Sequence, residues 1–135
     1  MSQLAYLQPD LEPQADTVDA AAAMRGVFAI TDTWGLNTRE VMAILGHPAR
    51  ATFFNWKGGR VKGVPHDTLM RIGYVAGIFK ALQILYSDPA LADRWLRQPN
   101  AGLDGHQPLD LMTGDTMIGL ARVRAYLDAA RGPWG

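Results

Sequence analysis

The stretch from Asn37 to Lys62, NTREVMAILGHPARATFFNWKGGRVK, decides the fold of the N-terminal half of this chain. Asn37 is followed three residues later by Glu40, which is the pattern of a capping box at the start of a helix. A short helix is therefore expected over 38–45, and Gly46 supplies the permissive backbone of a tight turn. Two short helices joined through such a turn predict a helix-turn-helix.

The second helix of this pair has the features of a recognition helix. Pro48 occupies a favourable first position, so the helix is expected over 48–57 with Phe53 and Trp56 on its buried face. Outward Arg, Thr and Asn side chains can hydrogen-bond base edges, and the cations that follow would lie beside phosphates. The predicted DNA-binding residues are Arg50, Thr52 and Asn55 for bases and Lys57, Arg60 and Lys62 for phosphates. Many all-α proteins contain two helices joined by glycine without binding DNA, and this alternative stays open.

The charge of the chain is unevenly distributed. Its 13 Lys and Arg residues balance 13 Asp and Glu residues, so the formal net charge is zero. Between Asn37 and His66, however, five basic residues face Glu40 alone, and the first 36 residues are correspondingly acidic. A local basic patch on a neutral protein suits a short phosphate footprint better than general polyanion binding.

Every other periodic segment is helical, and no strand pattern of useful length is found. Further helices are expected at 15–34, ended by Gly35, and at 67–86, capped by Asp67. A short helix should follow the cap Asp88 and Pro89, with Leu91, Trp95 and Leu96 facing inward. The last two elements are a short turn at 109–113, opened by Pro108, and a helix at 116–130, capped by Gly114 and Asp115. The fold class is predicted to be all-α, an N-terminal helix-turn-helix bundle followed by a helical domain. The expected divisions are a flexible N-terminal arm at 1–14, the helix-turn-helix domain at 15–64 and the helical domain with its C-terminal tail at 65–135.

The segment 69–86, within the helix expected at 67–86, is the most apolar part of the chain. It carries two neighbouring apolar stripes, so as a helix it needs cover on two sides. A second subunit could supply part of this cover and give a homodimer with the two-fold symmetry of a paired DNA half-site, or the helix could be fully buried in a monomer. A membrane span is not expected, because Arg71 and Lys80 interrupt the segment.

Several function classes lack their signatures in this sequence. There is no cysteine, so neither a disulfide framework nor a thiolate metal site is expected. The three histidines, His47, His66 and His106, stand in predicted turns or loops without paired ligands, and no glycine-rich phosphate loop occurs. We expect no enzyme, no cofactor and no metal site, and the absence of a secretory signal favours the cytoplasm.

Three runs in the C-terminal half contain short sequence motifs that are specific when they occur together. They are DPALADRWLRQPN at 88–100, GHQPLDLM at 105–112 and VRAYLDAARG at 123–132. Together they resemble the C-terminal toxin-binding domain of Xre/MbcA/ParS-type antitoxins. The preceding helix-turn-helix resembles the Xre-like N-terminal domain of the same family, although Gly46-His47-Pro48-Ala49 departs from its usual turn of glycine, apolar residue and serine.

This resemblance implies a type II antitoxin that binds a RES-domain toxin, which consumes NAD or transfers ADP-ribose. In that family the antitoxin dimerises, binds the promoter of its own operon and covers the NAD cleft of the toxin with its C-terminal end. Because the last helix and the tail are expected to hold exposed cations and aromatics, the implied toxin-binding residues are Arg122, Arg124, Tyr126, Arg131 and Trp134. Of these, Arg131 and Trp134 are the strongest candidates for blocking the cleft.

Two other classes of function stay open beside the antitoxin. The chain could be a helix-turn-helix transcriptional regulator whose C-terminal half only dimerises. It could also be a structural adaptor that holds an unrelated enzyme through its helical half. Promoter binding without a toxin partner would favour the first, and a stable complex with a non-toxic neighbour would favour the second.

Overall fold

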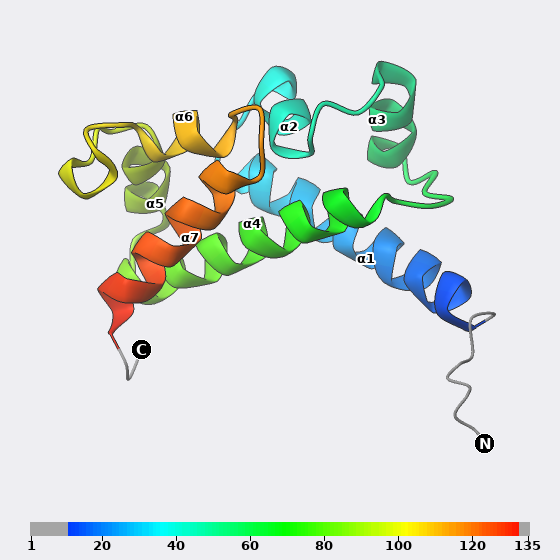
Figure 1. Cartoon of the computed structure of the whole chain (residues 1–135), viewed down its shortest axis with the longest axis horizontal. Coiled ribbons are helices and arrows are strands. Elements are labelled where there is room, and N and C mark those ends of the chain that lie inside the picture. The colour runs from blue at the N-terminus through cyan, green and yellow to red at the C-terminus, as the bar shows by residue number, and fades with distance from the viewer. Residues whose placement is uncertain (1–10, 133–135) are drawn as a thin grey trace.

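The computed structural model describes residues 11–132, with side chains from Ala20 onward, and this part of the chain consists of helices joined by short loops (Figure 1). In chain order the elements are α1 Leu11–Thr33, α2 Thr38–Ile44, α3 Arg50–Lys57, α4 His66–Leu85, α5 Pro89–Leu96, the 3₁₀ helix η1 Ala101–Leu103, α6 Pro108–Met112 and α7 Ile118–Arg131. No strand occurs within residues 11–132. The predicted all-α class is confirmed.

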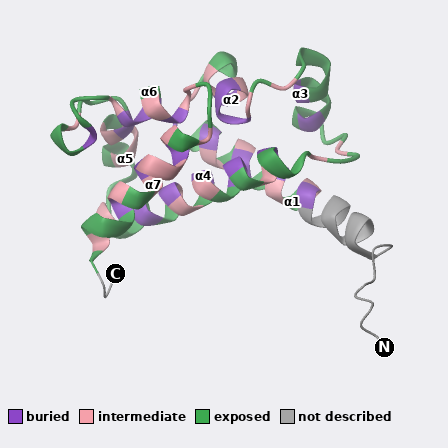
Figure 2. Ribbon diagram, in the orientation of Figure 1, coloured by how far each residue is buried: buried purple, intermediate pink, exposed green. Residues whose placement is uncertain are grey.

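Helix α4 lies at the centre of the fold, between α1 on one side and α7 on the other. Buried positions occur on all three helices (Figure 2), and a single cluster of buried apolar side chains runs through both halves of the chain. It joins Trp34 and Phe53 of the N-terminal half to Ile78 of α4 and Leu120 of α7. The chain itself therefore provides the two-sided cover that α4 requires.

By length and hydropathy, α4 also meets the criterion for a membrane-spanning helix, and no other helix in the described part of the chain does. This is weak evidence for a span, because the core helix of a folded domain meets the same criterion. The buried positions of α4, among them Val75 and Ile78, lie in the core cluster.

The start of the helix-turn-helix follows the sequence pattern closely. The Asn37 Oδ1 atom accepts a hydrogen bond from the Glu40 backbone N–H at 2.8 Å, and the Glu40 Oε1 atom accepts one from the Asn37 N–H at 2.9 Å. The predicted capping box is thus formed. Gly46 has φ +90°, a left-handed conformation that favours glycine, as the turn requires.

Three predicted helix starts were wrong. Helix α3 begins at Arg50 instead of Pro48, since His47 follows Gly46 in the left-handed region and lengthens the turn. Helix α4 begins at His66, one residue before its predicted cap Asp67, whose carboxylate instead accepts a hydrogen bond from Arg71. Helix α7 begins at Ile118, beyond Gly114 and Asp115, and the Thr116 hydroxyl accepts from the Ile118 N–H at 3.3 Å.

Two further expectations also differ from the structure. Helix α1 begins at Leu11 rather than near Ala15, so it overlaps the arm expected at 1–14. Pro13 falls in its first turn, where proline is tolerated; residues 1–10 lie outside the described part of the chain. On α5, Leu91 is exposed instead of facing inward, because this short helix packs through its last turn, where Leu96 is fully buried.

A buried arginine on α4 supports the turn of the helix-turn-helix. Arg71 is only 5% exposed, and its Nε donates to the Asp67 carboxylate at 2.9 Å while Nη1 reaches the Ile44 carbonyl oxygen, at the end of α2, at 3.5 Å. The guanidinium also covers Gly46, where an added Cβ would lie 2.9 Å from Nε. Glycine is therefore required at position 46 for its conformation and for the close approach of Arg71.

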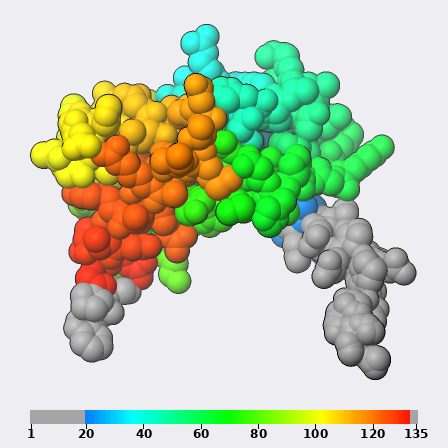
Figure 3. Space-filling model, in the orientation of Figure 1, coloured from blue at the N-terminus to red at the C-terminus, as the bar shows by residue number. Residues whose placement is uncertain are grey.

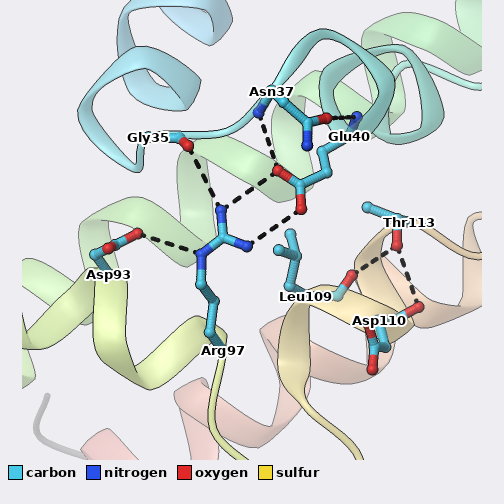
Figure 4. A network of polar contacts seen from close by, with 8 residues as sticks. All are labelled: Gly35, Asn37, Glu40, Asp93, Arg97, Leu109, Asp110 and Thr113. Atoms are coloured by element: carbon cyan, nitrogen blue, oxygen red, sulfur yellow. Dashed lines mark hydrogen bonds and ion pairs between the residues drawn. The ribbon is translucent and has the colours of Figure 1, made fainter.

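A second polar contact joins the two halves directly (Figure 4). Arg97, at the end of α5, donates to both oxygens of the Glu40 carboxylate at 3.2 and 3.3 Å, reaches the Gly35 carbonyl oxygen at 3.5 Å and pairs with Asp93 at 3.9 Å. Partial burial alone would raise the pKa of Glu40, but the hydrogen bonds from Arg97 and from the Asn37 backbone bring this pKa below its usual value. The carboxylate that caps α2 is thereby also the anchor for α5.

The double requirement at Gly46 gives a test with an internal control. Gly59 also has a positive φ, +87°, but nothing lies within 4 Å of a Cβ added there. Gly59→Ala should lower the free energy of unfolding by roughly 1–2 kcal/mol, the cost of a left-handed alanine. Gly46→Ala should lower it by roughly 2–4 kcal/mol, because Arg71 must also move. Urea unfolding followed by circular dichroism measures both, and equal losses would contradict the contact with Arg71.

The Arg97–Glu40 pair should give a pH-dependent contribution to stability. Because the pKa of Glu40 is lowered in the folded chain, the contribution is present above the ordinary value of 4.5 and is lost as pH falls through the lower folded value. Near neutral pH, Arg97→Gln should cost about 0.5–1 kcal/mol, a small value because the arginine side chain is 41% exposed. Urea unfolding between pH 7 and pH 3 should show this difference shrinking, with Arg94→Gln on the same helix as control; a constant difference would show that Glu40 is not the partner.

Candidate functional site

The outward face of α3 presents the predicted DNA-binding residues. Phe53 and Trp56 are buried, and this fixes the opposite side of the helix toward solvent. All six predicted side chains are exposed, on α3 and on the loop that follows: Arg50, Thr52, Asn55, Lys57, Arg60 and Lys62. The arrangement expected for a recognition helix is present, and its contact with DNA stays a prediction.

Several of these side chains already have partners within the chain. The Arg50 guanidinium lies 4.9 Å from the centre of the Phe54 ring, and the Lys57 ammonium lies 5.3 Å from the centre of the Phe28 ring. Arg60 Nε donates to Asn55 Oδ1 at 3.0 Å. These contacts restrict the side chains before any partner binds, and for Asn55 they occupy the acceptor that a two-bond contact with adenine would use.

A groove between α2 and α3 adds residues that the sequence pattern did not reveal. It has a volume of about 460 Å³ and is lined by Thr38, Arg39, Met42, His47, Arg50 and Phe54. Its charged and titratable lining residues are arginines and a histidine, and Phe54 is 38% exposed. No side chain caps the start of α3, so its first backbone N–H groups are available to an anion. The groove therefore offers cations for phosphates beside an apolar surface suited to a thymine methyl group.

Sequence patterns could not have identified this groove as a unit. Arg39 lies between Asn37 and Glu40, so the capping box already accounts for the sequence pattern around it and gives no sign of a DNA contact. His47 has the appearance of a solvated turn residue, and Phe54 adjoins the buried Phe53. Only the crossing of α2 and α3 brings the three side chains to one surface.

In the C-terminal half, the three sequence runs at 88–100, 105–112 and 123–132 converge in space. Helix α6 packs on α5 and α7, and η1 also packs on α7. Trp95 from the first run stacks on Tyr126 from the third, with ring centres 6.3 Å apart. The Tyr126 ring also covers Gly102, where an added Cβ would collide with it. The connecting loop is held by Asn100, which accepts from the Gly102 N–H at 2.8 Å and pairs with His106.

The predicted toxin-binding side chains on α7 are less free than expected. The expectation that they are exposed was wrong, since Arg122, Arg124, Tyr126 and Arg131 are all half-buried. Arg122 pairs with Asp104 of the η1 loop, which the helical pattern of α7 does not show. Arg124 pairs with Asp128 at 3.3 Å and covers Gly77 of α4. Arg131 pairs with Asp128 at 3.9 Å, while Trp134 lies outside the described residues.

Among the side chains that the structure describes, from Ala20 to Gly132, no three or more His, Cys, Asp or Glu residues form a group that could hold a metal ion. What the described surface offers is contact by cations, aromatic rings and backbone N–H groups.

Comparison with known proteins gives two matches. Residues 81–133 match the antitoxin Xre/MbcA/ParS C-terminal toxin-binding domain, which here begins within α4 and includes α5, η1, α6 and α7. The chain is also 40% identical over 122 residues to the uncharacterized protein y4oB of Sinorhizobium fredii, a match that covers 89% of this chain and 92% of the relative. The matched domain contains the stacked Trp95 and Tyr126. On this evidence the chain belongs to the Xre/MbcA/ParS family of antitoxins.

Proposed function

We propose that this antitoxin neutralises a RES-domain toxin that consumes NAD or transfers ADP-ribose, and that it represses its own operon by binding operator DNA. The observation that carries the first part is the match of residues 81–133 to the toxin-binding domain. The three runs that converge on α7 support a single toxin-binding face in that domain. The type of toxin is inferred from the family resemblance of the same runs.

Neutralisation by this chain would be a matter of binding rather than catalysis. A segment that fills an active-site cleft excludes the substrate without any chemistry of its own. Helix α7 ends at Arg131 at the margin of the molecule (Figure 1), and this end of the helix is proposed to face the toxin. An Arg or Trp anchor of this kind can supply a large part of the energy of an interface.

DNA binding is proposed from the groove between α2 and α3 and from the exposed cations beside it. Arg39 and Arg50 would contact DNA on either side of the groove, while Lys62 would contact a phosphate farther along. The surface of α2 and α3 and the end of α7 lie on opposite sides of the molecule (Figure 3). One antitoxin could therefore hold DNA and toxin at the same time.

A homodimer is proposed to bring two such surfaces to a paired operator site. A groove of about 320 Å³ between α1 and α4 is lined by small and apolar side chains, including Gly26 and Gly73. Met70 on α4 is exposed as well. Small residues allow helices of two subunits to approach closely, and a two-fold axis would relate the two half-sites.

Growth of cells that express the toxin tests neutralisation. The toxin would be induced from the open reading frame adjacent to this gene, with wild type, Trp134→Ala or a chain ending at Gly132 supplied beside it. Wild type should restore growth, and both altered chains should restore it less. If Trp134 is an anchor, its loss should raise the Kd for purified toxin about 30-fold.

Thermal unfolding of the altered chains should match wild type, since truncation after Gly132 leaves α7 complete. Equal rescue by all three forms would contradict the role of the tail while keeping neutralisation. An adjacent product that does not slow growth would contradict the proposed toxin and favour a regulator whose C-terminal half only dimerises.

Titration of the promoter fragment with purified antitoxin tests DNA binding. Arg50→Ala and Arg39→Ala should each lower affinity about 10-fold, because each removes a charged contact to DNA. Lys62→Ala should weaken binding to all sequences and reduce the slope of log affinity against log salt by about 1. Lys80→Ala, an exposed lysine on α4, is the control and should bind as wild type does. Unchanged affinity of both arginine variants would contradict the proposed groove.

A further inference from the structure

A pocket lies at the junction of the two halves of the chain, apart from both surfaces described above. It is formed by the end of α1, the C-terminal half of α4 and the start of α5, with a volume of about 440 Å³. Its lining includes three aromatic residues, Trp34, Phe79 and Tyr86, together with Leu82, Gln83 and Ala92. An apolar cavity of this size with a few polar groups is typical of a binding site.

Trp34 gives this pocket an unusual chemical feature. Its side chain is only 1% exposed and packs on Phe79, with ring centres 6.0 Å apart. The indole Nε1–H nevertheless has no hydrogen-bond acceptor among the described residues. A buried donor without a partner is costly and rare in folded proteins, so the pocket has a feature that packing of the described residues does not explain.

The position of the pocket indicates which partner fits it. The lining from Leu82 to Ala92 belongs to the matched toxin-binding domain, whereas Trp34 comes from the N-terminal half. The same segments of α4 and α5 carry two large exposed apolar side chains, Ile84 at 51% and Leu91 at 36% exposure. A protein partner that binds this domain can therefore cover apolar surface around the pocket as well as inside it.

We infer that the pocket receives an apolar side chain of the toxin, which packs against its aromatic lining. This inference rests on the proposed neutralisation of a toxin and adds a second anchor point, separate from the C-terminal end. An apolar residue in a desolvated pocket is the usual form of an interface anchor. Because Trp34 directly precedes the loop that leads to α2, toxin contact here would also rigidify the base of the helix-turn-helix.

Filling the pocket tests this inference. Ala92→Phe places a ring in the pocket, and Ala90→Phe places the same ring on an exposed position of the same helix as a matched control. Isothermal titration with purified toxin should give a Kd raised at least about 10-fold by Ala92→Phe and unchanged by Ala90→Phe.

Folding of each variant is checked by circular dichroism and thermal unfolding. If Ala92→Phe does not fold, Ser87→Phe at the exposed edge of the pocket takes its place, with the same expected loss. Wild-type affinity in a folded variant that fills the pocket would overturn the inference. So would a pocket variant that dissociates an antitoxin dimer in light scattering, or a small molecule found bound to wild type by native mass spectrometry. Absence of binding by wild type itself would instead contradict the proposed function.

Discussion

Burial of α4 is the constraint on which the rest of the structure depends. A helix with apolar residues on most of its circumference is stable in water only when neighbours cover it from more than one direction. Here α1 covers one side and α7 the other, and their buried side chains form one cluster. The helix-turn-helix and the toxin-binding helices are consequently both fixed to α4, and the length of this helix sets the distance between them.

Polar contacts then determine how the outer helices are oriented on α4. Arg71 of α4 hydrogen-bonds the end of α2, at the turn before α3, and Arg97 at the end of α5 hydrogen-bonds Glu40 near the start of α2. Both contacts use groups with a second task, since Gly46 forms the turn and Glu40 caps a helix. Apolar burial alone would leave these short helices free to shift, whereas directional hydrogen bonds to fixed groups allow one arrangement.

Features that depend on near neighbours in the sequence could be predicted, and features that depend on distant segments could not. The capping box at Asn37, the turn at Gly46 and the cap at Asp88 each need only a few consecutive residues, and each is present. Asp67 had an equally good local pattern, but Arg71, which also reaches the α2–α3 turn, recruits its carboxylate instead. Three features arise where separate elements come into contact: the groove with Arg39 and Phe54, the Arg122–Asp104 pair and the pocket at Trp34. Residue spacing within one segment does not predict such contacts.

The region matched to the toxin-binding domain begins at Ala81, which is fully buried near the end of α4. A boundary read from sequence similarity therefore cuts through the helix that both halves share. Such a chain should unfold as one cooperative unit, because neither half keeps a complete core without the other. A chimera that joins this DNA-binding half to the toxin-binding half of a relative would need all of α4 and the facing side of α1 from one parent. Modular exchange of partners is thus limited here by packing, before any question of recognition arises.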